Sequence, residues 1–389
     1  MNIVMATHYF ESHRGGVEIA AGQLARAFTA LGHQVTWIAC DSSPPPADTT
    51  VCCRATSLEA NNWLERQFGI PYPVTLPGTS RQIDSEIDKA NLVLVHDAFF
   101  LPCRLVQRRA HRAAKPCLIV QHIGVVPYRA PLLRFAMATL DHVLTRPALS
   151  ASAQVVFISE LTRRYFNGTR YAQSPMVLFN GVDSATFAPA PPEVCRSSLR
   201  ASLGLDPARP AVLFVGRFVE KKGMVHLEHM ARSTPEWDWL LAGWGPIDPS
   251  QWQLPNVHVF SNRSGATLTP LYQAADTLVL PSVGEGFPLV VQEALACGLA
   301  VVCGDDTVQA DPAAQQHLVG VRVDPMNPRA TSAAFVRALA PLVQRAEPDH
   351  AMCIARAEFA RNRYSWHAMA KQLVAVSAAL LTAPGNSKL

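Results

Sequence analysis

Apolar runs of strand length recur along the chain, and stretches with helical apolar spacing separate them. The first series comprises MNIVMA (1–6), HQVTWIAC (33–40), NLVLVH (91–96), CLIVQH (117–122), AQVVFIS (153–159) and PMVLFN (175–180). Strands in which apolar residues run without alternation are covered on both faces, which is typical of parallel sheets in α/β proteins. This pattern predicts a doubly wound parallel sheet.

The pattern starts again after residue 210. The second series comprises AVLFVG (211–216), WLLAG (239–243), VHVF (257–260), TLVLPS (277–282) and LAVVCG (299–304). The stretch 188–210 between the two series is rich in proline and has no sustained period, which favours a linker. A single core rarely grows beyond about 250–300 residues, and this chain has 389. We therefore expect two α/β domains, residues 1–190 and 191–365.

Composition excludes several other classes of protein. With 49% hydrophobic and 16% charged residues, the chain can bury large cores and is not intrinsically disordered. Its nine cysteines are odd in number and form no C-x-x-C pair, which predicts buried thiols in a reducing cytosol. Neither a signal peptide nor a spanning apolar segment is evident, so we expect a cytoplasmic protein that at most lies on a membrane.

The distribution of charge suggests where an anionic partner would bind. A net charge of +4 is too small to indicate a nucleic-acid partner. Residues 1–190 hold 17 Lys+Arg against 13 Asp+Glu, whereas the remainder holds 17 of each. The first domain alone therefore carries the positive excess.

In open parallel sheets, ligands bind beyond the carboxyl ends of the strands, so the loops there are the places to look for chemistry. Gly15 and Gly16 end the first such loop, directly before a predicted helix. Glycine allows backbone N–H groups to approach a phosphate, and the helix N-terminus favours its charge. A tight turn without any ligand is the alternative.

A second loop carries clustered cations. Arg217 follows a predicted strand, and Lys221 and Lys222 lie a few residues on, before Gly223. Fixed cations at a strand end suit a diphosphate whose charge must be compensated as it leaves. A solvated surface is the alternative for such a charge cluster.

The most informative stretch is GEGFPLVVQEALACG (284–298). We expect Pro288 to be the first residue of a helix, because proline is favoured at that position. The N–H groups around Phe287 and Leu289 then form an anion site. Glu293 lies about five residues into this helix, where its carboxylate can accept hydrogen bonds from the two adjacent hydroxyls of a ribose.

These segments resemble the retaining glycosyltransferases of family 4, which have the GT-B fold. The segments that carry the resemblance are GGVE (15–18), VVFISE (155–160), FNGVDSATF (179–187), FVGR (214–217), Lys222-Gly223, AGWGP (242–246) and the E-x7-E element from Glu285 to Glu293. The resemblance implies two Rossmann-like domains that face a cleft, with the acceptor bound by the first and the donor by the second. It also implies that a final helix, within residues 366–389, crosses back to the first domain.

The resemblance implies roles for individual residues. Arg217 and Lys222 would hold the donor diphosphate, and Glu293 the nucleotide ribose. The donor sugar would face Glu285 and the backbone of Gly286, Phe287 and Pro288. Family members often have glycine where this chain has Pro288, so one N–H contact is missing here.

His122 matches the first-domain histidine that family members place near the reacting sugar. A neutral or cationic imidazole there could hydrogen-bond a sugar hydroxyl or stabilise the transition state. The adjacent pair His96-Asp97, at the end of NLVLVH, is the rival candidate.

The expected function is transfer of a hexose, with retention, from a nucleotide sugar to a glycan or lipid-linked acceptor of the cell envelope. A UDP-sugar is favoured over GDP-mannose. We expect no cofactor and no metal, because no Asp-x-Asp pair follows a strand end. Basic residues in 103–115 and 131–146 suggest attachment to the anionic inner face of the plasma membrane.

Two other classes of enzyme remain as alternatives. A GT-B-type epimerase or hydrolase would act on a sugar nucleotide without any glycan acceptor. A nicotinamide-dependent enzyme would use a similar doubly wound fold, but the chain has no G-x-G-x-x-G fingerprint.

Overall fold

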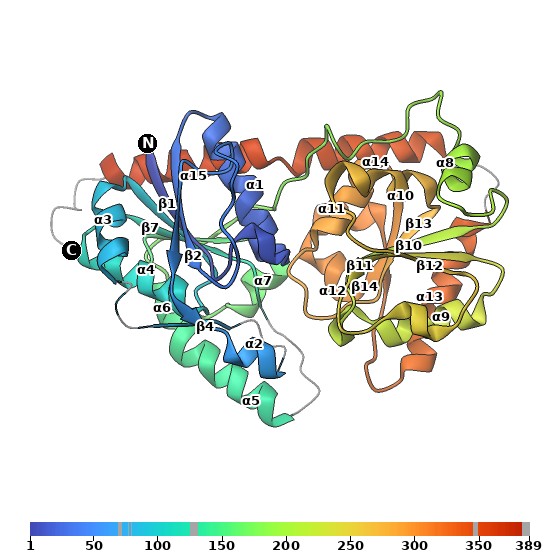
Figure 1. Ribbon diagram of the computed structural model, residues 1–389, viewed down its shortest axis with the longest axis horizontal. Coiled ribbons are helices and arrows are strands. Elements are labelled where there is room, and N and C mark those ends of the chain that lie inside the picture. The colour runs from blue at the N-terminus through green and yellow to red at the C-terminus, as the bar shows by residue number, and fades with distance from the viewer. Residues whose placement is uncertain (69–71, 77, 79, 125–130, 345–348, 383–389) are drawn as a thin grey trace. The chain divides into compact units, whose positions relative to one another are not determined.

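The computed structural model describes residues 1–389 except 69–71, 77, 79, 125–130, 345–348 and 383–389 (Figure 1). The chain divides into two compact units. Unit 1 comprises Met1–Gly181 together with Trp366–Leu389, and unit 2 comprises Val182–Ser365.

Unit 1 is built on a parallel sheet with the strand order β3-β2-β1-β6-β7-β8-β9. The strands are β1 (Asn2–Ala6), β2 (Gln34–Cys40), β3 (Arg54–Leu58), β6 (Leu92–His96), β7 (Cys117–Gln121), β8 (Gln154–Phe157) and β9 (Met176–Val177). The strands β6, β7 and β8 are buried along their whole length, because helices cover both faces of the sheet. A separate two-stranded antiparallel pair is formed by β4 (Ala60–Asn61) and β5 (Val74–Thr75).

Helices connect the strands of unit 1. They are α1 (Gly16–Ala30), α2 (Trp63–Phe68), α3 (Ser80–Lys89), α4 (Leu101–Arg112), α5 (Pro131–Leu140), α6 (Arg146–Ser150) and α7 (Glu160–Tyr165), with a π-helical segment (Asp141–Thr145) between α5 and α6. The last helix of the chain, α15 (Trp366–Thr382), packs on α1 and belongs to unit 1 (Figure 1).

Unit 2 repeats the architecture with the strand order β12-β11-β10-β13-β14-β15. All five strand pairs of this sheet are parallel. The strands are β10 (Ala211–Arg217), β11 (Asp238–Trp244), β12 (Val257–Phe260), β13 (Thr277–Leu280), β14 (Ala300–Gly304) and β15 (Leu318–Val321).

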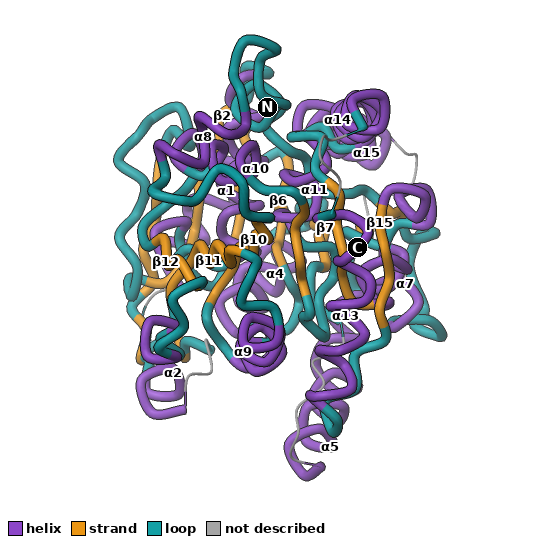
Figure 2. Tube along the Cα trace, turned by 90° about the vertical axis from the view of Figure 1, so that its right-hand side faces the viewer, coloured by secondary structure: helices purple, strands orange, loops and turns teal. Residues whose placement is uncertain are grey.

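The helices of unit 2 cover both faces of its sheet. They are α8 (Arg196–Ser202), α9 (Met224–Ser233), α10 (Thr269–Ala274), α11 (Leu289–Ala296), α12 (Asp305–Ala310), α13 (Pro328–Val343) and α14 (His350–Arg363). Figure 2 shows α9 and α13 on one face, where they contact each other, and α10 and α11 on the other. The expected α/β fold with two Rossmann-like units is confirmed.

Besides the short pair β4 and β5, two strands of the parallel sheets escaped the sequence pattern. Both β3 and β15 lie at or near an edge of their sheets and keep exposed positions, so their sequences lack the continuous apolar run of a central strand. The position of the boundary also differs, because the chain passes between the units at Gly181. Residues 188–210, predicted as a linker, instead pack on unit 2, where buried Arg200 forms an ion pair of 2.8 Å with Asp276.

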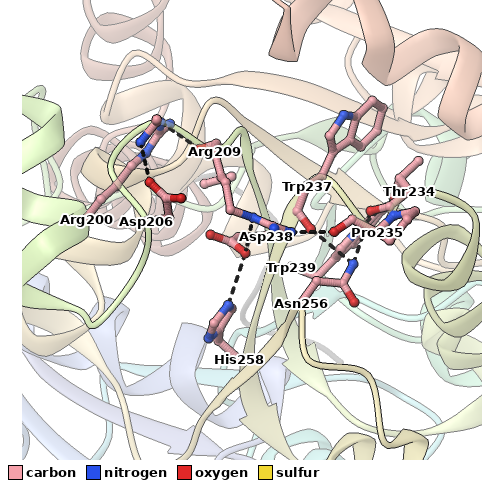
Figure 3. Close-up of polar contacts among 12 residues, drawn as sticks. Arg200, Asp206, Arg209, Thr234, Pro235, Trp237, Asp238, Trp239, Asn256 and His258 are labelled. Carbon is pink, nitrogen blue, oxygen red and sulfur yellow. Dashed lines mark hydrogen bonds and ion pairs between the residues drawn. The ribbon is translucent and has the colours of Figure 1, made fainter.

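The amino edge of the unit 2 sheet is held by polar contacts (Figure 3). Asp238 begins β11, and its Oδ1 lies 3.0 Å from Arg209 Nε and 3.3 Å from His258 Nε2. Nearby, Asn256 Nδ2 lies 3.1 Å from each of three backbone carbonyl oxygens, those of Ala231, Thr234 and Trp237. These contacts tie neighbouring strands together at the edge opposite the carboxyl ends.

Candidate active site

The loops after β10 and β13 meet at the carboxyl edge of the unit 2 sheet, because these two strands are neighbours. The backbone N–H of Val283 donates to the carbonyl oxygen of Lys221 at 3.1 Å. Lys222 Nζ lies 3.0 Å from Glu285 Oε1. The structure therefore brings together two residues that the sequence placed separately on the donor side.

Electrostatics keep the Glu285 carboxylate charged. Burial by itself would raise the pKa of Glu285, but Lys222 and then Lys221 outweigh it, and the pKa is lowered. The side chains of Lys222 and Glu285 keep only 14% and 15% of their exposed area. A charged pair this close occupies the end of the strand where an anionic ligand was predicted.

Glycine at position 223 is required by the turn that carries Lys222. Gly223 has φ +78°, in the left-handed region, and a Cβ there would lie 2.4 Å from the carbonyl oxygen of Pro281. A side chain at this position would push the Lys222 loop away from the loop that carries Glu285.

Arg217 ends β10 and is held differently from Lys222. Its guanidinium carbon lies 4.8 Å from the centroid of the Trp244 indole, at the end of β11. Its Nε is buried without a hydrogen-bond partner, and within the described part of the chain no carboxylate pairs with this guanidinium. No described residue therefore neutralises its charge.

Glu293 has a partner that sequence reasoning missed. Tyr272, on α10, donates a hydrogen bond of 2.7 Å from its hydroxyl to Glu293 Oε2. Burial raises the pKa of Glu293 to about 7, although the Tyr272 hydrogen bond acts against this rise. Tyr272 sits in an ordinary helical apolar pattern, so no sequence signal distinguished it from a core residue.

The helix that carries Glu293 begins one residue later than predicted. Pro288 precedes the helix with ψ 133°, so it is the extended capping residue and Leu289 is the first helical residue. The ring of Phe287 is buried and lies 5.5 Å from the ring of Tyr364. The predicted donor contacts of Gly286, Phe287, Pro288 and Leu289 stay predictions.

In unit 1, the two rival histidines lie side by side. His96 ends β6 and His122 follows β7, the next strand in the sheet. One imidazole donates to the other across 2.9 Å between His96 Nδ1 and His122 Nε2. Burial lowers the pKa of His122 to about 3, with nearby His8 adding to the effect. His122 is therefore neutral at physiological pH.

Asp97 positions the loop that carries His122. Its Oδ1 accepts hydrogen bonds from Gln121 Nε2 at 2.6 Å and from the backbone N–H groups of His122 and Ile123 at 3.1 Å each. Its backbone has φ +64°, which is uncommon for a residue other than glycine. Complete burial raises the pKa of this carboxyl to about 7.

The buried carboxylate of Glu18 lies beside the predicted phosphate loop of unit 1. Gly15 caps α1 and Gly16 begins it, as expected. A Cβ on Gly15 would lie 2.1 Å from Glu18 Oε2, so the Glu18 side chain folds back onto this turn. Glu18 Oε1 also lies 2.8 Å from His8 Nε2. The phosphate contact predicted for Gly15 and Gly16 stays a prediction.

Comparison with known proteins decides the family. The profile of "Glycosyltransferase Family 4" matches residues 14–186, and that of "Glycosyl transferases group 1" matches residues 209–341. The chain belongs to the family 4 glycosyltransferases.

Individual relatives and solved structures are similar to this family 4 glycosyltransferase. D-inositol 3-phosphate glycosyltransferase of Segniliparus rotundus is 32% identical over 225 residues, which are 53% of this chain and 47% of that relative. The chain thus matches about half the length of this curated relative.

Two solved structures share the fold over nearly the whole chain. Sucrose-phosphate synthase of Thermosynechococcus elongatus has a TM-score of 0.73 and 21% identity, covering 99% of this chain and 100% of that one. Anabaena HepE in complex with UDP-glucose has a TM-score of 0.67 and 15% identity, covering 97% and 100%. At these identities the likeness shows the fold alone.

Most of the predicted basic surface of this glycosyltransferase serves internal contacts. Arg104 donates to the carbonyl oxygen of Leu144, and Arg109 forms an ion pair of 2.8 Å with Asp84. Lys115 Nζ donates to the carbonyl oxygens of Asp88 and Ala90 at 2.7 and 2.9 Å, and Arg146 Nη2 donates to that of Tyr165 at 2.9 Å. The side chain of Arg134 lies outside the described part.

Among the described residues, no group of three or more His, Cys, Asp or Glu side chains could hold a metal ion. None of the helices described is long and apolar enough to span a bilayer.

Proposed function

We propose that this protein is a retaining hexosyltransferase that uses a nucleotide sugar, with a UDP-sugar favoured over GDP-mannose. One observation carries the proposal. Arg217 ends β10 without a carboxylate partner among the described residues, and the Lys222–Glu285 pair and the half-buried Glu293 lie on the loops and the helix that follow β10 and the adjacent strand β13. The relative HepE was solved with UDP-glucose, which supports a UDP-sugar as donor.

In this proposal Arg217 and Lys222 bind the donor diphosphate. Arg217 has no carboxylate partner among the described residues, so a phosphate oxygen can become its first counter-ion. Lys222 shares its charge with Glu285 at 3.0 Å, and a bound diphosphate would compete with that carboxylate. Glu285, partly released from Lys222, would then accept a hydrogen bond from a hydroxyl of the donor sugar.

Glu293 binds the ribose in this proposal. Its carboxylate must be ionised to accept hydrogen bonds from both ribose hydroxyls, and its pKa of about 7 means that the apo protein holds it partly protonated. Tyr272 orients the acid through Oε2, which leaves Oε1 for the ligand. Nucleotide binding is therefore expected to strengthen as the pH rises through 7.

His122 acts as a neutral hydrogen-bonding group toward the sugar. With a pKa of about 3 it cannot supply a proton or a positive charge near pH 7. His96, at 2.9 Å, fixes its ring orientation, and Asp97 fixes its backbone. Of the two roles open from the sequence, the geometry favours hydroxyl binding.

The bond changes follow from retention without a protein nucleophile. The bond between the sugar's anomeric carbon and the diphosphate oxygen breaks, and the bond to the acceptor oxygen forms on the same face. The acceptor's proton passes to the departing diphosphate, whose charge Arg217 and Lys222 stabilise. Glu285 is not assigned as the nucleophile, because this proposal uses its carboxylate to accept a hydrogen bond from a hydroxyl of the donor sugar. We propose that the reaction needs neither a metal nor another cofactor.

For the acceptor we propose a glycan or lipid-linked sugar of the cell envelope, with unit 1 lying against the membrane surface. Phe135 on α5 and Val143 on the π-helical segment are 72% and 59% exposed, which suits shallow insertion. Arg108 and Arg112 on α4 are exposed as well. Flotation with vesicles of phosphatidylglycerol and phosphatidylcholine tests this: binding lost in Phe135→Ser supports it, and no binding at low salt contradicts it.

A phosphorylated sugar or polyol is the second candidate for the acceptor. D-inositol 3-phosphate glycosyltransferase and sucrose-phosphate synthase, to which the chain is similar, both carry such a compound in their names. Soluble sugar phosphates tested beside lipid-linked sugars distinguish the two acceptor classes.

A thermal-shift panel of UDP, GDP, ADP and dTDP tests the donor class, followed by turnover with the matching sugar nucleotides. We expect UDP to raise the melting temperature most. If none of the four nucleotides raises the melting temperature, the donor proposal is wrong. Turnover that proceeds equally well without any acceptor would instead favour the epimerase or hydrolase alternative.

A further inference from the structure

We propose that Trp244 is a positioning residue that holds the Arg217 guanidinium ready for the donor diphosphate. The inference rests on the proposed role of Arg217 and extends it to a residue outside the predicted site. Arg217 and Trp244 are register partners at the carboxyl ends of β10 and β11. The guanidinium carbon lies 4.8 Å from the indole centroid, which is within cation–π range.

The backbone around Trp244 is fixed by close contacts with the β10 strand and its loop. The backbone N–H of Phe218 donates to the carbonyl oxygen of Trp244 at 2.7 Å. A Cβ on Gly243 would lie 1.9 Å from the carbonyl oxygen of Gly216, and one on Gly245 would lie 2.4 Å from that of Phe218. Trp244 thus lies between two glycines, and a side chain at either position would displace β10 or the residue that follows it.

Arg217 and Lys222 are anchored by different chemistry. Lys222 is held by Glu285 at 3.0 Å, and this carboxylate neutralises the charge that it positions. An indole face attracts a guanidinium through its quadrupole but carries no net charge. Trp244 therefore orients Arg217 while leaving its full positive charge available to a phosphate.

The exposure of Trp244 argues against a purely structural role. The indole is 39% exposed, whereas Trp239 on the same strand is completely buried. Large apolar groups contribute little to the core when they remain this exposed. Preorganisation of Arg217 gives a physical reason for an indole here, since a free arginine loses side-chain freedom when it binds an anion.

A double-mutant cycle tests the inference. The dissociation constant of UDP is measured by calorimetry for wild type, Trp244→Ala, Arg217→Ala and the double variant. We expect Trp244→Ala to weaken UDP about 3- to 10-fold, because Arg217 must then be ordered on binding. In the Arg217→Ala background the same change should have no further effect. Trp244→Phe should restore most of the affinity, since a phenyl ring also attracts a guanidinium.

Two further measurements separate this role from others. UMP affinity should hardly change in Trp244→Ala, whereas a base-stacking role would weaken UMP and UDP equally. Trp63→Ala, which removes a 55% exposed indole from unit 1, is the matched control, and urea unfolding checks that every variant is folded. Equal losses from Trp244→Ala with and without Arg217 would overturn the inference. If wild type binds UDP, GDP, ADP and dTDP no better than background, the proposed function itself fails.

Discussion

Titratable side chains lie at the carboxyl edges of both sheets, but their charge states differ. In unit 2 no described carboxylate pairs with Arg217, and the Glu285 carboxylate is kept ionised beside Lys222. In unit 1 His122 is neutral, and Asp97 is partly protonated with a pKa of about 7. Neighbouring charges explain the difference: Lys222 and Lys221 outweigh the effect of burial on Glu285, whereas burial dominates at His122 and Asp97, which are 6% exposed and completely buried. One fold thus supports a charged edge suited to a diphosphate and a nearly neutral edge suited to hydroxyl groups.

The largest effect is expected at the charged edge. Arg217→Ala should slow turnover about 10²- to 10³-fold, because this cation stabilises the departing diphosphate. Binding of the intact donor should weaken much less. Steady-state and single-turnover rates with the best donor measure this, and Arg232→Ala, a surface arginine paired with Glu228, is the control. An unaltered rate would remove Arg217 from the leaving-group role.

The internal carboxylate of unit 1 should matter for stability. Glu18 is 2% exposed and pairs with His8 at 2.8 Å; burial would raise its pKa, but His8 outweighs this and the pKa is lowered. Glu18→Gln should reduce the unfolding free energy by about 3 kcal/mol. A lowered pKa stabilises the fold above pH 5, and this advantage should fade below about pH 4. Urea unfolding measures it, with Glu160→Gln, whose side chain is 25% exposed, as control; equal losses in both variants would contradict the burial argument.

His122 tests the neutral edge. His122→Ala should lower kcat about 10- to 100-fold through the loss of a buried hydrogen bond to the sugar. Because its pKa is about 3, the ratio of wild-type to His122→Asn rates should stay constant between pH 5 and 8. A rate ratio that changes with a midpoint near 6.5 would mean that His122 ionises during catalysis. The exposed His111→Ala serves as the control.

Glu293 gives a smaller, pH-dependent effect. Glu293→Gln should weaken UDP about tenfold at pH 8, where the carboxylate of the wild type is ionised, and hardly at all at pH 6. Calorimetric titrations at several pH values measure the dissociation constant of UDP for both proteins. Their ratio at each pH removes the effect of protonation of UDP itself, because that effect is the same for both. A pH-independent difference would separate Glu293 from the ribose.

Asp97 should give the smallest effect. Its pKa is raised from the ordinary value to about 7, so the folded protein holds a proton that the unfolded chain releases near pH 4. Because of this group, the wild-type protein becomes less stable as the pH rises from 4 to 7. Asp97→Asn keeps an oxygen for the three hydrogen bonds and should gain about 1 kcal/mol on wild type between pH 6 and 7. Parallel unfolding curves against pH would contradict the raised pKa; Asp84→Asn is the control.

The sequence predicted the central strands and the candidate residues at their ends, but not their states. Strands β3 and β15 were missed because partly exposed strands carry no continuous apolar run. Tyr272 and Trp244 gave no separate signal, since their roles come from contacts with Glu293 and Arg217, which are 21 and 27 residues away. Pro288 was placed one residue too far into the helix, because proline suits both the capping and the first helical position.

By itself, the sequence determined the fold class, the two-part organisation and the family, since apolar periodicity and glycine-bounded loops are local properties of the chain. The tertiary structure alone decided the charge states and the partners. Lys222 meets Glu285, and His96 meets His122, because parallel strands bring distant loops to one edge. The physical reason is that burial and pairing, which set a pKa, depend on neighbours in space rather than in sequence.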